Sequence, residues 1–225
     1  MVEIKFYLKQ GSKPIGFDYY EKLHGWVCKL VGNDCYGKSI NKYIYSNISG
    51  ALYNKDGISL KDGVGTFVIR TNDSNVFNNF LKNYDSIKNK ELFYGVKLTG
   101  FAINSIFEIT KTRFRTKIES PILIHSKKYP ELNNKMWYDD EDLANCEKYI
   151  KGSIFKKANA QGIKLDKNLS IKIINQKKHS DIIYHKVRNI GRIFDLEINC
   201  DEPTKEFIAL NGIGASCGNG FGMIE

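Results

Sequence analysis

Hydrophobic and polar residues follow two different periods in the first hundred residues. Residues 2–9 alternate, with the apolar side chains on one face, which predicts a half-buried strand. From residue 17 to about 31 the apolar positions recur at helical spacing, and Gly32 ends the expected helix. The further elements expected in this half are strands at 43–52 and 64–70 around a turn at 54–57, a helix that opens at Asp73 and a strand at 91–102. This β-α-β-β-α-β order is typical of the ferredoxin-like arrangement.

The second half of the chain has a comparable order of elements without a visible sequence repeat. Its longest helical pattern covers residues 138–160 and opens with four acidic residues at the positive end of the helix dipole. The strands expected here are 107–115, 117–124, 171–174, 182–187, 192–198 and a last short one at 223–224. We therefore predict an α+β protein of two tandem ferredoxin-like domains, residues 1–103 and 104–225, with a glycine-rich loop near its end.

The end of the chain is unusually rich in glycine. Five glycines fall within eleven residues: Gly212, Gly214, Gly218, Gly220 and Gly222. Glycine loses more backbone entropy on folding than any other residue, so such a cluster indicates positive φ, close backbone approach or a ligand packed against bare amides. A flexible tail is the alternative, but the alternation with apolar residues favours a loop that feeds a last buried strand.

Charge and composition limit the classes of partner. The chain carries 34 Lys and Arg against 25 Asp and Glu, a formal net charge of +9, and its hydrophobic content of 42% indicates a folded protein. A basic surface favours a polyanionic partner, with nucleic acid ahead of a membrane surface.

The cysteines argue against a metal site and a disulfide framework. They are five in number, widely scattered, and no two have metal-ligand spacing, so we expect no metal and no cofactor. The first residues lack the apolar region of a signal peptide and no apolar run could cross a bilayer, which predicts a cytoplasmic protein without a membrane partner.

Three segments carry a resemblance to a known family. They are the glycine-rich stretch 212–224, the Ser-Pro stretch 117–124, and Leu23-His24-Gly25 followed by Tyr43-Ile44-Tyr45-Ser46. In order and spacing they resemble the CRISPR repeat-RNA endoribonucleases of the repeat-associated mysterious protein superfamily. The resemblance implies metal-independent cleavage of precursor CRISPR RNA, in which a 2′-hydroxyl attacks the adjacent phosphate and leaves 2′,3′-cyclic phosphate and 5′-hydroxyl ends. It implies CRISPR repeat RNA as the partner, with an effector complex and a homodimer as further candidates.

His24 is the leading catalytic candidate. It lies at the border of the apolar face of its helix, with Tyr20 one turn before it, and histidine suits proton transfer near neutral pH. Relatives carry a catalytic lysine where this chain has Lys38 and Lys42, and Tyr36 is a second tyrosine candidate beside Tyr20. Ordinary solvated lysines and packed tyrosines are the alternatives.

One departure from the family pattern concerns histidine. Some relatives have their working histidine just before the strand that matches residues 43–46, but residues 33–38 contain none. A non-catalytic RNA-binding subunit of the same superfamily is therefore the alternative function, and an unrelated basic RNA-binding protein is a third.

Candidate RNA-binding residues come from a basic stripe and from the glycine loop. Lys111, Arg113, Arg115 and Lys117 occupy alternate positions, which places them on one face of a continuous strand, and His125 follows the Ser-Pro stretch. Such a stripe can track phosphates, although a solvated sheet face gives the same pattern. The loop glycines either present amides to phosphate or serve packing between the two halves.

Overall fold

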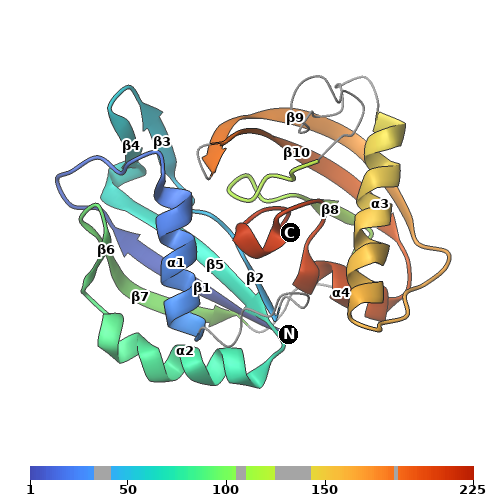
Figure 1. Ribbon diagram of the computed structural model, residues 1–225, viewed down its shortest axis with the longest axis horizontal. Helices are drawn as coiled ribbons and strands as arrows, with labels where there is room; N and C mark the ends of the chain where they lie inside the picture. The colour runs from blue at the N-terminus through green and yellow to red at the C-terminus, as the bar shows by residue number, and fades with distance from the viewer. Residues whose placement is uncertain (33–41, 105–109, 125–142, 185–186) are drawn as a thin grey trace.

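The computed structural model describes residues 1–32, 42–104, 110–124, 143–184 and 187–225 (Figure 1). The N-terminal half, residues 1–104, is built on a five-stranded antiparallel sheet in the order β2-β5-β1-β7-β6. Its strands are β1 (Val2–Lys9), β2 (Tyr43–Tyr45), β5 (Val64–Thr71), β6 (Glu91–Phe93) and β7 (Val96–Asn104). Together with helices α1 (Tyr19–Val31) and α2 (Ser74–Ile87), the order β2-β5-β1-β7 is the ferredoxin-like one. A separate hairpin of β3 (Ala51–Asn54) and β4 (Gly57–Leu60) follows β2.

The predicted periods of β1 and α1 are confirmed. The inward side chains of β1, Ile4, Phe6 and Leu8, are buried, and the ring of Phe6 stacks on Phe67 at 4.6 Å between centroids. The apolar stripe of α1 packs on the same side of the sheet as α2, in one core. Asp73 begins α2 as expected, because its carboxylate accepts hydrogen bonds from the amides of Asn75 and Val76.

The C-terminal half has a smaller sheet of related topology. Its elements are β8 (Arg113–Arg115), α3 (Leu143–Ala160), β9 (Ser170–Tyr184), β10 (Val187–Asn199) and α4 (Glu202–Asn211). The strands pair antiparallel in the order β8-β10-β9. The chain end occupies the fourth strand position, because the backbone groups of Arg115 and Glu225 bond to each other and Thr116 bridges Ile224.

Several predicted strands were wrong in extent. The range 91–102 is a hairpin that turns at Tyr94 and Gly95, and 43–52 contains β2 and only the start of β3. Residues 117–124 form no strand: Ile122 and Leu123 make isolated bridges only, because the Ser120 side chain and the carbonyls of 120–121 bond the glycine loop. Of the expected strand 182–187, residues 182–184 end β9 and residue 187 begins β10.

The sequence reading missed α4 altogether. The helix starts at the side chain of Asp201, which accepts a hydrogen bond from the amide of Thr204, and it carries Pro203 in its first turn. Of the predicted helix 138–160, the described part begins at Leu143.

The end of the chain joins the two halves. Met223 and Cys217 pack on Ile44 and Val68, on the face of the N-terminal sheet opposite the helices, while Phe221 reaches the helical core. Figure 1 shows this segment running between the two sheets. The division into domains 1–103 and 104–225 stays a prediction, which limited proteolysis would test.

Arg70 on β5 is the main polar tie between the halves. Its side chain is 1% exposed, and its guanidinium donates to the carboxylate of Glu3 and to the carbonyls of Ala209 and Ile224. Burial lowers the pKa of Arg70, and the carboxylate of Glu3 opposes this shift. A charged group this deep needs each of these partners.

Candidate active site

Each ring nitrogen of His24 lies close to another side chain of the protein. His24 is half-buried on α1, and its Nδ1 lies 3.1 Å from the hydroxyl oxygen of Tyr45 on β2. Its Nε2 lies 3.6 Å from Sγ of Cys28, one turn further along the helix. The border position predicted for His24 therefore brings its ring to the edge strand of the sheet.

Tyr45 contacts the candidate catalytic histidine and was not among the residues predicted for the site. Its side chain is fully buried, so its hydroxyl is fixed relative to the ring of His24. Tyr43, two residues earlier on the same face of β2, places its hydroxyl 3.8 Å from Sγ of Cys28. The sequence could have indicated Tyr45, because Tyr43 and Tyr45 are two residues apart in a strand and their rings therefore lie on the same face, toward the helix.

Tyr20 contacts the β3–β4 hairpin and the end of the chain. Its hydroxyl lies 3.1 Å from that of Tyr53 on β3, and its ring stacks on Phe221 at 5.8 Å. Burial, and then the neighbouring Tyr53, raise the pKa of Tyr20 well above its ordinary value. Tyr20 therefore fits packing between α1 and the end of the chain better than proton transfer.

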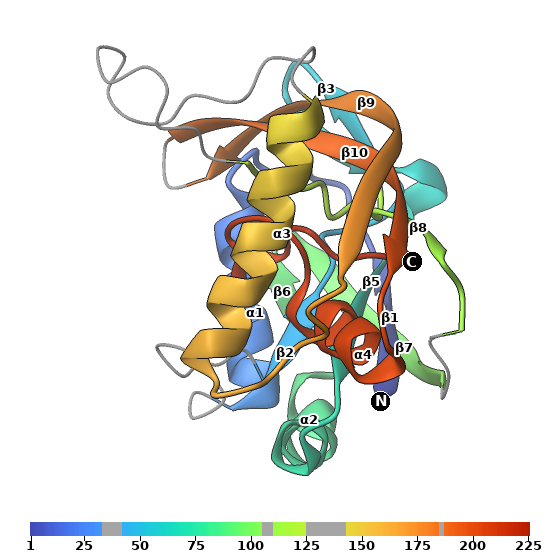
Figure 2. The same ribbon diagram turned by 90° about the vertical axis from the view of Figure 1, so that its right-hand side faces the viewer.

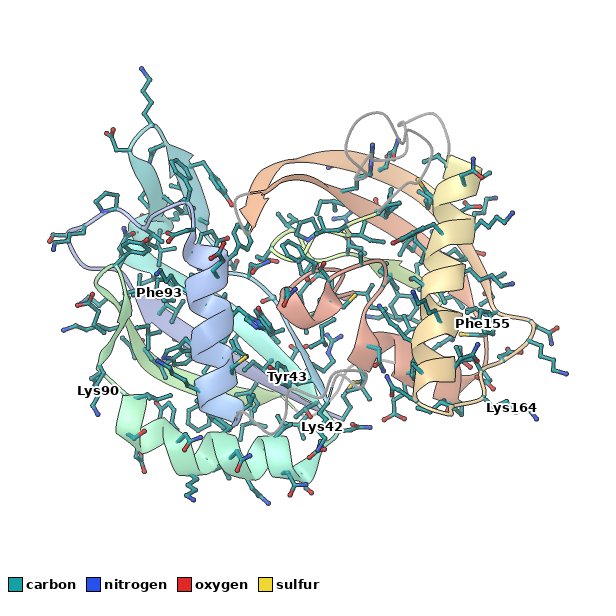
Figure 3. All side chains as sticks on the ribbon, viewed as in Figure 1. Lys42, Tyr43, Lys90, Phe93, Phe155 and Lys164 are labelled. Carbon is teal, nitrogen blue, oxygen red and sulfur yellow. The ribbon has the colours of Figure 1, made fainter. Side chains whose placement is uncertain are left out.

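Lys42 forms an ion pair at the start of α2. Its ammonium lies 3.4 Å from the carboxylate of Asp73, the N-cap of α2. Burial acts to raise the pKa of Asp73, but bonds from the amides of Val76 and Asn75 and the charge of Lys42 outweigh it and lower the pKa. Figure 3 shows Lys42 next to Tyr43 at the start of β2, between the two halves. Tyr36 and Lys38 lie outside the described residues.

Four glycines of the glycine loop donate their backbone amides within the protein. Gly212, Gly214, Gly220 and Gly222 all have positive φ and are buried. Their amides donate within the protein, to Ile208, to Ser153, to Cys217, and to Ser120 and Pro121, respectively. With these four amides engaged inside the protein, the geometry favours the packing alternative, and contact of the loop with RNA stays a prediction. Gly218 is half-buried in a short 3-10 turn, Cys217–Asn219.

Gly220 connects this loop to Tyr45. A Cβ at Gly220 would lie 2.9 Å from the Tyr45 ring and 2.8 Å from Oδ1 of Asn47. The carbonyl of Gly220 accepts hydrogen bonds from the side chains of Asn47 and Ser120. The loop thus packs directly behind the tyrosine that contacts His24.

Only part of the predicted basic stripe forms a strand, and part of its positive charge is neutralised by carboxylates. Arg113 and Arg115 are exposed on β8, whereas Lys111 precedes the strand and Lys117 follows it. Arg115 makes a bidentate contact with Asp195, and Nζ of Lys117 lies 3.0 Å from the carboxylate of Glu225. The hydrogen bond from Arg115 lowers the pKa of Asp195.

Two of the four cations are therefore matched by carboxylates. Among the described residues, the guanidinium of Arg113 has no hydrogen bond or ion pair, so it is the most available cation of the stripe. His125 lies outside the part of the chain that the structure describes.

Within the described ranges, no group of three or more His, Cys, Asp or Glu residues could hold a metal ion. None of the helices found there is long and apolar enough to cross a membrane.

Comparisons with known proteins agree with this architecture. A family model described as "CRISPR associated protein Cas6, C-terminal" matches residues 101–225. No curated protein matches the chain. A solved structure described as a Cas6-related gene product from Pyrococcus furiosus has a TM-score of 0.76 at 16% identity, covering 100% of this chain and 97% of the other.

Two further solved structures have the same fold. One, described as an RAMP protein binding different RNA substrates, has a TM-score of 0.78 at 16% identity and covers 100% of this chain and 99% of its own. Another, described as CRISPR associated protein Cas6, has a TM-score of 0.70 at 16% identity, with coverages of 100% and 98%. These likenesses confirm the predicted fold class of two tandem ferredoxin-like units.

Proposed function

The chain belongs to the Cas6 family of CRISPR-associated proteins. We propose that it is an endoribonuclease that cuts CRISPR repeat RNA without a metal ion. In this reaction a ribose 2′-hydroxyl attacks the adjacent phosphorus and the bond from phosphorus to the 5′-oxygen breaks. The 2′-hydroxyl loses a proton and the leaving 5′-oxygen gains one. The products are a 2′,3′-cyclic phosphate and a 5′-hydroxyl.

The observation that carries the proposal is the contact between His24 and Tyr45 beside the glycine loop. When Nε2 exchanges the proton, Nδ1 keeps its own, so Nδ1–H donates to the hydroxyl oxygen of Tyr45 both in the neutral imidazole and in the protonated one. Nε2 faces the thiol of Cys28, a weak hydrogen-bonding partner that RNA can displace. We assign the proton transfers to Nε2 of His24, and Tyr45 is its positioning residue.

Stabilisation of the phosphorane charge falls to the lysines before β2. Lys42 would have to exchange its contact with Asp73 for the phosphate, which its 37% exposed side chain allows. Lys38 and Tyr36 remain candidates for the same task. Arg113 and Lys111 would hold RNA at a distance from the reacting bond.

A non-catalytic RNA-binding subunit is the second candidate function. It is favoured by the absence of histidine from residues 33–38 and by the fact that both ring nitrogens of His24 have neighbours within the protein. The similarity to an RAMP protein described as binding different RNA substrates also fits it. Participation in an effector complex and homodimer formation stay predictions under either function.

The experiment is incubation of the purified protein with its repeat RNA in EDTA, followed by analysis of the product ends. We expect one cut, a 2′,3′-cyclic phosphate, and no cut in an RNA with a 2′-deoxynucleotide at the mapped position. Cleavage of the 2′-deoxy RNA would overturn the reaction. Tight binding of the repeat without any product would favour the second candidate.

A further inference from the structure

A pocket unrelated to the His24 contacts opens between the two halves. Its volume is about 330 Å³. The N-terminal half contributes Lys42, Asn72 and Asp73, the turn after α3 contributes Gln161 and Ile163, and α4 contributes its outer face around Glu206. Figure 2 shows α4 beside β2 and above α2, which is where these three parts of the chain meet.

The pocket combines an apolar wall with a few polar groups. Ile163, Phe207 and Leu210 line one part of it, and Ile163 remains 42% exposed. The amide nitrogen of Gln161 donates to Oδ1 of Asn211 at 2.7 Å, which leaves the carbonyl oxygen of Gln161 as an acceptor. An apolar wall with few convergent polar groups is the usual character of a small-molecule or base site.

The carboxylate of Glu206 is the distinctive group. It is half-buried, and within the described ranges it has no hydrogen bond or ion pair. The other carboxylate, that of Asp73, is already used by Lys42 and by the amides of α2. Whether Lys42 stays on Asp73 or turns to the reacting phosphate, Glu206 leaves the pocket with a net negative charge, which disfavours a phosphate inside it and favours a ligand with N–H donors.

We propose that this pocket binds a guanine base splayed out from single-stranded RNA. The Watson–Crick edge of guanine presents two adjacent N–H donors, which the carboxylate of Glu206 would accept as a pair, and one carbonyl oxygen, to which the amide of Asn72 would donate. The planar base packs against Ile163 and Phe207. The inference rests on the proposed function in that RNA is the ligand, but it does not require cleavage.

The pocket lies next to the segment that leads into β2, the strand that carries Tyr45. Lys42 lines the pocket and begins the segment that leads into Tyr43 and Tyr45 of β2. A base held here would fix an RNA nucleotide at the boundary of the two halves. This makes Glu206 a specificity-determining residue of the RNA site.

The test asks whether removal of the negative charge of Glu206 weakens or strengthens RNA binding. Oligouridylates with one central guanosine, inosine or adenosine are bound to the wild-type protein, Glu206→Gln and Glu202→Gln. Glu202 is exposed in the first turn of the same helix and does not line the pocket. Removal of a negative charge strengthens binding to a polyanion when the carboxylate is merely solvated.

We expect the wild type and Glu202→Gln to prefer guanosine over inosine, which lacks the 2-amino group, and over adenosine by about tenfold. Glu206→Gln should lose that preference and bind the guanosine oligonucleotide more weakly in spite of its lower negative charge. Tighter binding by Glu206→Gln, no base preference in the wild type, or failure to bind any oligonucleotide would overturn the inference. A guanosine preference in a protein that cuts no repeat RNA would support guanine binding in the pocket and contradict the proposed nuclease activity.

Discussion

Nδ1 of His24 lies 3.1 Å from the hydroxyl of Tyr45, which joins the middle of α1 to the edge strand β2. Gly220 packs against the ring of that tyrosine from the other side. A residue near the start of the chain is thereby positioned through a loop almost two hundred residues later. The glycine cluster therefore packs against the residue that contacts the candidate catalytic histidine.

Tyr45→Phe should lower the rate constant of cleavage at saturating RNA by about tenfold to a hundredfold, with little change in the affinity for RNA. The substitution keeps the buried ring and removes only the hydroxyl beside Nδ1 of His24, so orientation of the imidazole is lost without loss of packing. Single-turnover rates and a filter-binding assay measure the two quantities separately.

Tyr53→Phe is the matched control, because it removes a hydroxyl that bonds Tyr20 on the same helix. A rate constant that stays at the wild-type level in Tyr45→Phe, or one that falls equally in Tyr53→Phe, would contradict a positioning role.

Alkylation of Cys28 should inactivate the protein. Its Sγ lies 3.6 Å from Nε2 of His24, so a maleimide adduct would occupy the space that RNA needs. Burial raises the pKa of the Cys28 thiol, and only the thiolate reacts, so inactivation should be slow at pH 7 and should quicken steadily as the pH rises. Cys28→Ser should resist the reagent, and equal sensitivity of this variant would place the effect on another cysteine.

Gly222→Val should unfold the protein or destabilise it by about 3 kcal/mol or more. Gly222 has φ +71°, and a Cβ there would clash with the carbonyl oxygen of Ile213. Gly25→Ala is the control on α1, where nothing lies within 4 Å of the added methyl, and it should stabilise by about 0.5–1 kcal/mol. Urea denaturation of both variants decides the point, and wild-type stability of Gly222→Val would refute a packed loop.

Arg113→Ala should weaken RNA binding more than Arg115→Ala. Arg115 is held by Asp195, whereas Arg113 is exposed and its guanidinium has no partner among the described residues. Loss of one phosphate contact should reduce the slope of log affinity against log salt by about one. Binding measured from about 50 to 200 mM salt tests this, and identical slopes for both variants would contradict the ranking.

Local patterns in the sequence were sufficient for much of the N-terminal half. Apolar residues at every second position predicted β1, and apolar residues at a spacing of 3.6 predicted α1. The border position of His24 followed from the same helical wheel. These features depend on neighbouring residues only. The element order was likewise enough for the fold class, because the ferredoxin-like arrangement is a sequence of local elements.

Long-range contacts account for what the sequence did not reveal. The partners of Arg70 are 139 and 154 residues further along the chain, and Tyr45 meets His24 only because β2 pairs with β5 beneath α1. The basic stripe looked free because Asp195 and Glu225, which neutralise part of it, are distant in sequence. The helix α4 is an exception, since Asp201 and Pro203 were readable start signals.

The central claim, that His24 catalyses metal-independent cleavage, is tested most directly by single-turnover cleavage of the repeat RNA in EDTA. His24→Ala is compared with the wild type and with Lys22→Ala, a surface change on the same helix that removes only a weak pair with Asp18. We predict that Lys22→Ala cuts at the wild-type rate and that His24→Ala is slower by about 10²- to 10⁴-fold while it still binds the RNA. Cleavage by His24→Ala at the wild-type rate would contradict the account.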